Sequence, residues 1–203
     1  MLNVAKIVPT ERSAHALARS ARADMVGSYD RAREYGATFT DEQEQAIAKA
    51  VANVTAERTL KRIQNNEGQY FVARKDGQPL AFGRFNHWGL ADQAPYESGM
   101  RAKVYGGLGS IGIVNTFIAP LGIFSLFGAE GVSEQAQEKG LELLTKHVID
   151  LAGNREIRIG LSVGDPLTET LDENYFEPTD KIAHDVTHVP ALDQVLYIRK
   201  NNP

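Results

Sequence analysis

The feature that most constrains this chain is a strand, a helix and a second strand that follow one another in its last hundred residues. An apolar run ends at Phe127, and an amphipathic helix opens at about Gln135. A second strand is predicted over Ile157 to Val163, and a short helix then leads to Tyr175. A helix start attracts anions, so this order of elements is typical of an α/β fold that holds a diphosphate at a helix N-terminus.

The composition narrows the class of protein. A net charge of −4 argues against a nucleic-acid partner, because nucleic-acid-binding proteins usually have a basic surface. The chain has no cysteine, which excludes disulfides and thiolate metal ligands. Its start lacks the apolar core of a signal peptide, and polar residues and a proline interrupt the apolar region from Ile111 to Phe127. We therefore expect a cytoplasmic location and no membrane partner.

The first 68 residues are predicted to form a short strand and two helices. The strand covers Leu2 to Val8, and the first helix ends at Gly36. Thr40 to Gln43 fits a capping box, in which the two side chains satisfy backbone donors reciprocally. The apolar face of this second helix continues through Leu60 and Ile63, so the pattern predicts one helix up to Asn65.

The period then changes from helical to that of strands. Gln69 to Arg74 and Pro79 to Trp88 are predicted strands, and the Asp-Gly pair at 76–77 between them is a strong hairpin signal. A long loop is expected over 89–107, and a further sheet segment over Gly109 to Ala119. Leu121 to Phe127 either continues that segment beyond a bend or forms a separate strand.

The last part of the chain alternates helices and strands. Ser133 is expected to cap the central helix, and Asp165 to cap the short helix that has Pro166 at its first position. Gln194 to Arg199 is a predicted closing strand. The inner face of the central helix is expected to hold Ala136, Gly140, Leu143, Leu144, Val148 and Leu151. With no repeat or linker, residues 1–203 are expected to form one α/β domain.

This order of elements resembles the GNAT superfamily of N-acyltransferases. The resemblance covers nearly the whole chain and is more specific in the second half, where 165–178 is similar to the family's penultimate helix and 195–200 to its closing strand. It implies a mixed, mostly antiparallel, twisted central sheet flanked by helices. It also implies transfer of an acyl group from acyl-CoA, for instance acetyl-CoA, to a primary amine by direct attack.

The resemblance also implies where the acyl-CoA would lie. The strand before the central helix splays from its neighbour and leaves backbone groups free for the pantetheine arm, and here we expect that strand at Thr116, Phe117 and Ile118. The helix start binds the pyrophosphate, and the expected residues there are Gln135, Gln137, Lys139 and Gly140.

This chain departs from the family's pyrophosphate-binding motif at one position. Gln135 and Gly140 match its first and last positions, but Glu138 stands where the first glycine belongs, and a carboxylate there repels a diphosphate. Starting the motif at Gln137 instead puts Glu142 at the last position. Gly128, Gly131 and Ser133 are alternative positions for cradling the anion.

Two residues are candidates for moving protons. His87 has an ordinary pKa near neutrality and could accept the proton of the amine, although a strand-end histidine is commonly structural. The position of the family's acid tyrosine holds Leu171, and Tyr175 lies about one helical turn further on. We therefore name His87 and Tyr175 as the expected catalytic residues.

Other candidates have plainer interpretations. His184 and His188 could bind zinc only on a helix, and their surroundings favour an ordinary loop, so no metal is expected. A cationic acceptor could meet acidic residues of the first helix or the long loop, which are more often simply solvated. These acidic residues are Asp24, Asp30, Glu34, Asp92 and Glu97. Phe82, Phe85 and Trp88 could line an acceptor pocket but are more often core residues.

Two functions remain open at this point, and a metal-dependent enzyme that uses His184 and His188 is a distant third. The first is acyl transfer to the amine of a small molecule or a protein. The alternative is a catalytically inactive GNAT-like domain that binds a ligand or a partner. The loop over 89–107 either closes over a substrate or meets a second subunit, so a homodimer is among the expected partners.

Overall fold

The structure is a computed structural model that describes residues 1–65, 67–87, 121–162, 164–183 and 192–200. Within these residues the strands form one seven-stranded sheet in the order β1-β2-β3-β4-β5-β7-β6. All neighbouring strands are antiparallel except β4 and β5, which are parallel. This confirms the predicted mixed, mostly antiparallel sheet. The strands are β1 (Leu2–Lys6), β2 (Gln69–Lys75), β3 (Gln78–His87), β4 (Leu121–Gly128), β5 (Ile157–Ser162), β6 (Glu177–Ala183) and β7 (Gln194–Arg199).

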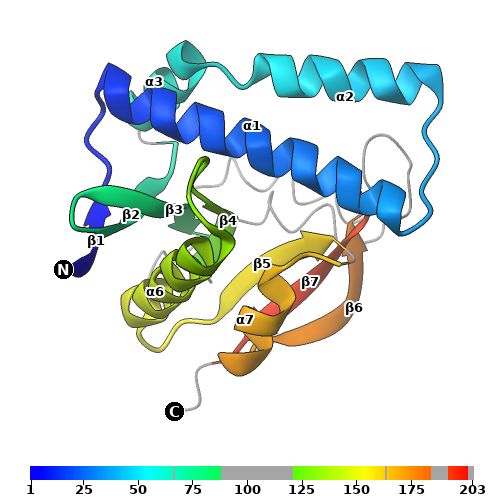
Figure 1. The fold of residues 1–203 in the computed structure, drawn as a ribbon. Helices are drawn as coiled ribbons and strands as arrows, with labels where there is room; N and C mark the ends of the chain where they lie inside the picture. Colours follow the sequence, from blue (N-terminus) through cyan, green and yellow to red (C-terminus); the bar gives the residue numbers. More distant parts are fainter. Residues whose placement is uncertain (66, 88–120, 163, 184–191, 201–203) are drawn as a thin grey trace, which may run out of the picture.

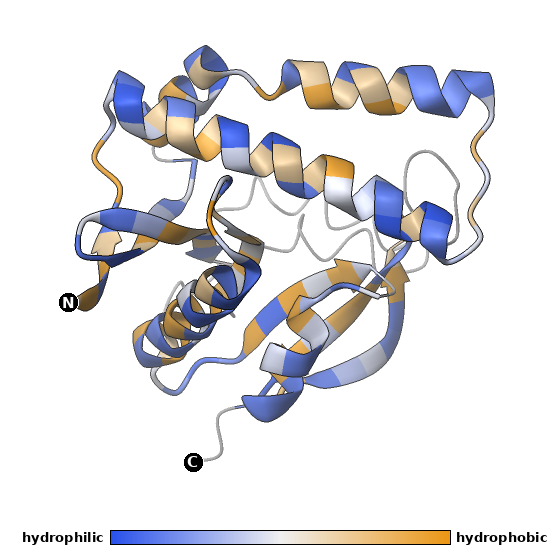
Figure 2. Cartoon of the chain, viewed as in Figure 1, coloured by the Kyte–Doolittle hydropathy of each residue, from blue (hydrophilic) through white to orange (hydrophobic). Residues whose placement is uncertain are grey.

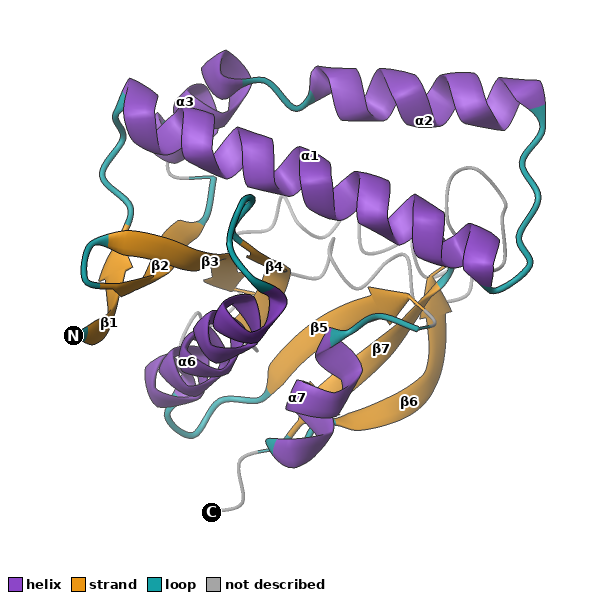
Figure 3. Ribbon diagram, in the orientation of Figure 1, coloured by secondary structure: helices purple, strands orange, loops and turns teal. Residues whose placement is uncertain are grey.

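Helices cover both faces of the sheet (Figure 1, Figure 3). Helix α1 (Glu11–Glu34) and helix α3 (Ala56–Gln64) lie on one face, and α2 (Asp41–Asn53) runs alongside α1. Helix α6 (Glu134–Ala152) and helix α7 (Leu167–Glu173) lie on the other face. Figure 2 shows hydrophobic residues gathered on the strands and on the helix sides that meet them. The described helices include none long and apolar enough to cross a membrane.

The alternation within β2 divides the core between the two faces. Phe71 and Ala73 belong to the cluster under α6 and α7, whereas Tyr70 and Val72 belong to the cluster under α1 and α3. Successive side chains of a strand point to opposite faces, so a four-residue apolar run serves two cores. This explains why the run shows little alternation in hydropathy although it lies within one strand.

The predicted hairpin and capping box are confirmed. Asp76 and Gly77 have φ values of 52° and 85°, which matches the left-handed pair that a tight hairpin turn requires. The Thr40 amide donates to Gln43 Oε1 at 2.8 Å, and the Gln43 amide donates to Thr40 Oγ1 at 3.3 Å.

Two predictions about the regular elements are wrong, and one strand was missed. The helix predicted to run from Thr40 to Asn65 is broken at Val54, because the Thr55 side chain accepts the Arg58 amide and starts α3 as a new helix. Leu151, expected inside, is 39% exposed, since the buried side of α6 runs through Leu141, Thr145 and Ala152. Strand β6 was not predicted, because as an edge strand it is mostly exposed and polar and shows no apolar pattern.

Candidate functional site

Strands β4 and β5 pair at one end and then separate. Their register covers only three residue pairs, from Leu121 with Ile157 to Ile123 with Ile159. Beyond Ile123, β4 continues to Gly128 paired only with β3, and β5 continues to Ser162 paired with β7. Among the described strands, none pairs with this edge of β4 along the part that leads to the start of α6.

The packing of α6 on the sheet fixes where its first turn lies. A Cβ atom at Gly140 would be 2.7 Å from the Leu80 Cβ and 2.8 Å from the Ala81 Cβ, closer than real Cβ contacts allow. Only glycine lets the helix backbone approach β3 this closely. The structure thus gives Gly140 a packing role, which holds the helix start beside the open edge of β4.

The loop between β4 and α6 is fastened at both sides. On one side, the buried Ser20 of α1 accepts the amide of Glu130 at 2.9 Å, and Arg19 forms an ion pair with the Glu130 carboxylate at 2.5 Å. On the other side, the Gln137 amide group donates to the carbonyl oxygens of Ala129 and Val132 at 2.9 and 3.0 Å. Gln137 therefore positions the loop.

These elements enclose a cavity of about 300 Å³, which we call the acidic cleft. It lies between the second half of α1, the end of β4, the start of α6 and the turn before α7. It is lined by Ala23, Asp24, Gly27, Arg31, Leu126, Phe127, Gly128, Glu130, Glu134, Gln137, Glu138, Leu141, Asp165, Pro166, Leu167 and Thr170.

Five carboxylates and one guanidinium lie among the residues lining this cleft. The carboxylates belong to Asp24, Glu130, Glu134, Glu138 and Asp165, and the guanidinium belongs to Arg31. The pair between Glu130 and Arg19 neutralises one of the five. The remaining excess of negative charge makes the cleft a place for a cation.

The carboxyl group of Asp24 has a raised pKa. Its side chain is open to the cleft, but protein atoms surround it on most sides, and this desolvation raises the pKa of Asp24 to about 6. The Asp165 carboxylate adds to the increase, and Arg31 opposes it. Desolvation also raises the pKa of Asp165, although the Leu167 amide donates to that carboxylate at 2.9 Å and limits the effect.

A glycine in a turn and a glycine at the end of β4 allow these elements to approach closely. Gly164 has a φ of 74°, and a Cβ there would lie 2.2 Å from the Tyr35 ring, so the end of α1 rests directly on the turn before Asp165. At Gly128 a Cβ would lie 2.2 Å from Gln137 Oε1. Both close contacts bring α1 and α6 against the turn and strand that line the acidic cleft.

Of the residues predicted to bind the acyl-CoA, the structure places only Gln137 in the cleft lining. Gln135 and Lys139 are exposed on the first turns of α6, and Gly140 faces the sheet. Thr116, Phe117 and Ile118 lie outside the described residues. The strand directly before the central helix is β4, so the open strand edge that the structure describes belongs to 124–128.

Neither predicted catalytic residue is found in the lining of the acidic cleft. Tyr175 lies away from the cleft, and the side chain of His87 is not among those that the structure describes. Tyr175 follows α7, is 81% exposed and has a φ of 63°, and it does not line the cleft. His87 is the last residue of β3, and its side chain lies outside the description. Leu171, at the position of the expected acid, is fully buried.

The remaining candidates divide between site and core. Asp24 was one of several acidic residues named for a cationic acceptor, and it lines the cleft. Phe82 and Phe85 are buried core residues at 3% and 1% exposure, as their plainer interpretation predicted. His184 and His188 lie outside the described residues, and in the described part no three acidic or histidine side chains form a metal site. Asp165 and Glu130 were missed, because Asp165 was assigned only a capping role and Glu130 carried no signal.

Comparison with known proteins identifies the fold. No family model and no curated protein matches the sequence. Among solved structures, the chain is similar to the PaiA N-acetyltransferase of Thermoplasma acidophilum in complex with coenzyme A, with 14% identity, 99% of both chains covered and a TM-score of 0.56. It is also similar to YncA, a putative acetyltransferase of Salmonella typhimurium with acetyl-CoA, with 10% identity, 99% and 94% coverage and a TM-score of 0.58.

A third similar structure names the family directly. It is an acetyltransferase of the GNAT family from Streptococcus agalactiae 2603, with 13% identity, 100% of this chain and 96% of that chain covered, and a TM-score of 0.58. Identities this low show a likeness of fold. The open, mostly antiparallel sheet with helices on both faces is therefore the GNAT fold, as the order of elements predicted.

Proposed function

We propose that this chain transfers an acyl group from an acyl-CoA thioester to a cationic primary amine. One observation carries the proposal: within a GNAT fold, the part of β4 that has separated from β5 lines the acidic cleft through Leu126, Phe127 and Gly128. The open edge of β4 suits an extended thioester arm, which needs backbone partners. The acidic cleft suits an acceptor that arrives as an ammonium ion.

Asp24 is the residue to which we assign proton transfer. The ammonium group of the acceptor gives a proton to the Asp24 carboxylate, and the amine nitrogen then attacks the thioester carbonyl carbon. A C–N bond forms, the C–S bond breaks, and the second amine proton passes to the leaving thiolate. A base is most effective when its pKa lies near the working pH, which the raised pKa of Asp24 approaches.

The diphosphate end of the donor is the poorest fit. Glu134 and Glu138 stand on the first turns of α6, where the dipole would otherwise favour an anion. A single carboxylate–phosphate contact costs on the order of 1 kcal/mol in water and more near a protein surface. We therefore propose that the open edge of β4 holds the donor more strongly than the helix start does.

A thiol-release assay with acetyl-CoA and a panel of amines tests the acceptor class. Spermidine should be acetylated in preference to glutamate, because the cleft repels a carboxylate. Asp24→Asn should lower kcat/KM on the order of 100-fold and remove the rise of rate through pH about 6. Asp30→Asn, on the same helix but outside the cleft lining, is the matched control and should retain activity. Equal losses in the two variants would contradict the assignment to Asp24.

A second function is favoured by the buried Leu171 and the acidic helix start. Both remove chemistry that acyl transfer by this fold uses, so a GNAT-like domain that binds a cation without catalysis is the competing proposal. Calorimetric titration with acetyl-CoA and with CoA separates the two. Binding of both supports the transferase. Failure of both to bind, with spermidine still bound, supports the binding domain.

A further inference from the structure

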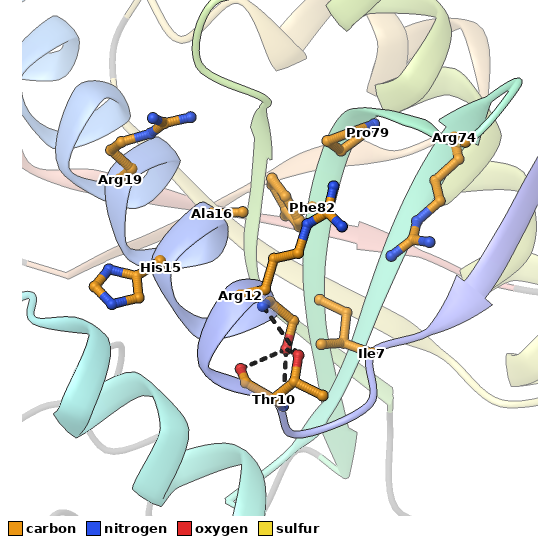
Figure 4. Close-up of a pocket in the computed structure, with 11 residues that line it drawn as sticks. Ile7, Thr10, Arg12, His15, Ala16, Arg19, Arg74, Pro79 and Phe82 are labelled. Carbon is orange, nitrogen blue, oxygen red and sulfur yellow. Dashed lines mark hydrogen bonds between the residues drawn. The ribbon is translucent and has the colours of Figure 1, made fainter.

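A second, larger cavity of about 640 Å³ lies along the first half of α1. Its other wall is the hairpin of β2 and β3, and Figure 4 shows the side chains that face it. Arg12, His15 and Arg19 recur at helical spacing along α1, and Arg74 comes from β2. We call this cavity the basic cavity, because none of its lining residues is acidic.

Two of the three guanidinium groups have no carboxylate partner among the described residues. Arg19 is paired with Glu130, but Arg12 and Arg74 take part in no described ion pair. The nearby Asp76, in the hairpin turn, bonds to the amino group of Met1 instead. Figure 4 shows Arg12 and Arg74 extending from opposite walls into the same space. Two unpaired cations facing one cavity repel each other, and a bound anion would relieve that repulsion.

One hydrogen-bond donor of the Arg74 side chain is unpaired among the described residues. Its Nε atom is buried and has no hydrogen-bond partner in the described structure. A buried donor without an acceptor costs free energy. This atom is shielded from the cavity, so an oxyanion there would bond to the terminal Nη groups of Arg74 and Arg12. At the start of α1 the capping box engages the amides of Thr10 and Ser13, which bond reciprocally to each other's side chains. The side chains therefore provide the charge.

The floor of the basic cavity is apolar. Ile7 and Phe82 line it, at 4% and 3% exposure, and Ala16 adds a small apolar surface from α1. Cavities of a few hundred Å³ with apolar walls and a few convergent polar groups are typical of small-molecule sites. A free inorganic ion would leave this floor unused, whereas an organic anion would cover it.

We propose that the basic cavity binds a small organic phosphate. The phosphate would lie between Arg12 and Arg74, each able to donate two parallel hydrogen bonds, and the organic part would lie against Phe82 and Ile7. Two unpaired guanidinium groups match the charge of a phosphate dianion better than that of a carboxylate. This inference uses no residue of the acidic cleft and does not rest on acyl transfer.

Calorimetric titration of the full chain with three probes tests the inference. Phenyl phosphate has the dianion and the ring, benzoate has the ring with one charge, and inorganic phosphate has no ring. Phenyl phosphate should bind more tightly than either of the others. Arg12→Gln and Arg74→Gln should each weaken its binding by about tenfold or more. Arg22→Gln, on α1 but outside the basic cavity, is the matched control and should change affinity by less than about twofold.

Three outcomes of this titration would overturn the inference. Absence of phenyl phosphate binding, or equal binding to all three variants, would remove the site. Benzoate binding as tightly as phenyl phosphate would contradict the phosphate. A thermal melt of each variant shows whether it folds, and Arg12→Gln serves as the decisive variant if Arg74→Gln disturbs the hairpin. Loss of spermidine acetylation with phenyl phosphate binding intact would count against acyl transfer alone.

Discussion

The acidic cleft and the basic cavity lie along the same helix, α1, and carry opposite charge. The basic cavity faces its first half through Arg12 and Arg19, and the acidic cleft faces its second half through Asp24 and Arg31. The ion pair of Arg19 with Glu130 joins the two, since each partner lines a different cavity. A net charge of −4 therefore describes neither region, and ligand preference is set by which side chains converge.

The two cavities also differ in the packing contacts that shape them. The acidic cleft depends on the close approach of α6 to β3 at Gly140 and on the contact of Tyr35 with Gly164. The basic cavity depends on α1 and on the β2–β3 hairpin, whose turn has left-handed residues at 76 and 77. A change in the packing of α6 should therefore affect the first and spare the second.

Gly140→Val should give the largest difference between the effects on the two cavities. The added Cβ would lie within 2.8 Å of β3 side chains, so α6 must move. We expect a loss of about 2 to 3 kcal/mol in the free energy of unfolding, measured by urea titration. Spermidine acetylation should fall, while phenyl phosphate binding should persist. Lys139→Val, with the same β-branched side chain on an exposed position, should cost under about 1 kcal/mol. Equal losses in both variants would argue against the tight helix–sheet contact.

Asp24→Asn should stabilise the protein at neutral pH. In the folded chain the pKa of Asp24 is raised from 3.8 to about 6, so folding holds a proton that the unfolded chain has released. The stability from this group is present below pH 3.8 and is lost as the pH rises through about 6. The variant should be more stable than the wild type at about pH 7.5, on the order of 1 kcal/mol after solvent screening, and no more stable at about pH 4.

Chemical unfolding at the two pH values measures this difference. Asp30→Asn is again the control, because Asp30 pairs with Arg33 and lies outside the cleft lining. A stabilisation that is the same at both pH values would mean that the charge of Asp24 is not its source.

Glu138→Gln should reduce the repulsion at the start of α6. Removing one carboxylate from the acidic cleft should tighten acetyl-CoA binding by about fivefold, since one such contact is worth on the order of 1 kcal/mol. Calorimetry on wild type and variant measures the change. Glu142→Gln, two turns into the helix and outside the cleft lining, should leave the affinity within about twofold. An unchanged affinity in Glu138→Gln would mean that the diphosphate lies elsewhere.

Glu130→Gln should give the smallest effect and act on both cavities in opposite senses. It frees Arg19 from its ion pair and removes one negative charge from the acidic cleft. Phenyl phosphate should bind about twofold to fourfold more tightly, and spermidine more weakly by a similar factor, because exposed ion pairs contribute at most about 1 kcal/mol. Movement of both affinities in the same direction would contradict the opposed charges.

Much of the fold could be predicted because local chemistry determines it. Asp76 and Gly77 specify a turn that needs left-handed residues, and Thr40 with Gln43 specifies a helix start. The break at Val54 was missed, since the apolar spacing continues across it while the Thr55 side chain starts a new helix. Strand β6 was missed, since an edge strand of exposed polar residues has no periodic signal.

The candidate site was predicted less well than the fold. The family motif pointed to the start of α6, and the structure does place a cavity there. The motif could not show that Gly140 is required by β3, or that Gln137 bonds to the loop before it. Both facts depend on contacts between elements, which a motif in one helix does not contain.

The sequence by itself determined the order of strands and helices apart from β6 and the break between α2 and α3, and, through its resemblance, the GNAT fold. The tertiary structure alone decided that Asp24, Glu130 and Asp165 face one cleft and that Arg12 and Arg74 face another. Turns, caps and amphipathic faces are fixed by interactions within a few residues. The charge of a cavity is the sum over side chains that are far apart in the sequence. Only the packing of α1 against the other elements brings those charges within reach of one ligand.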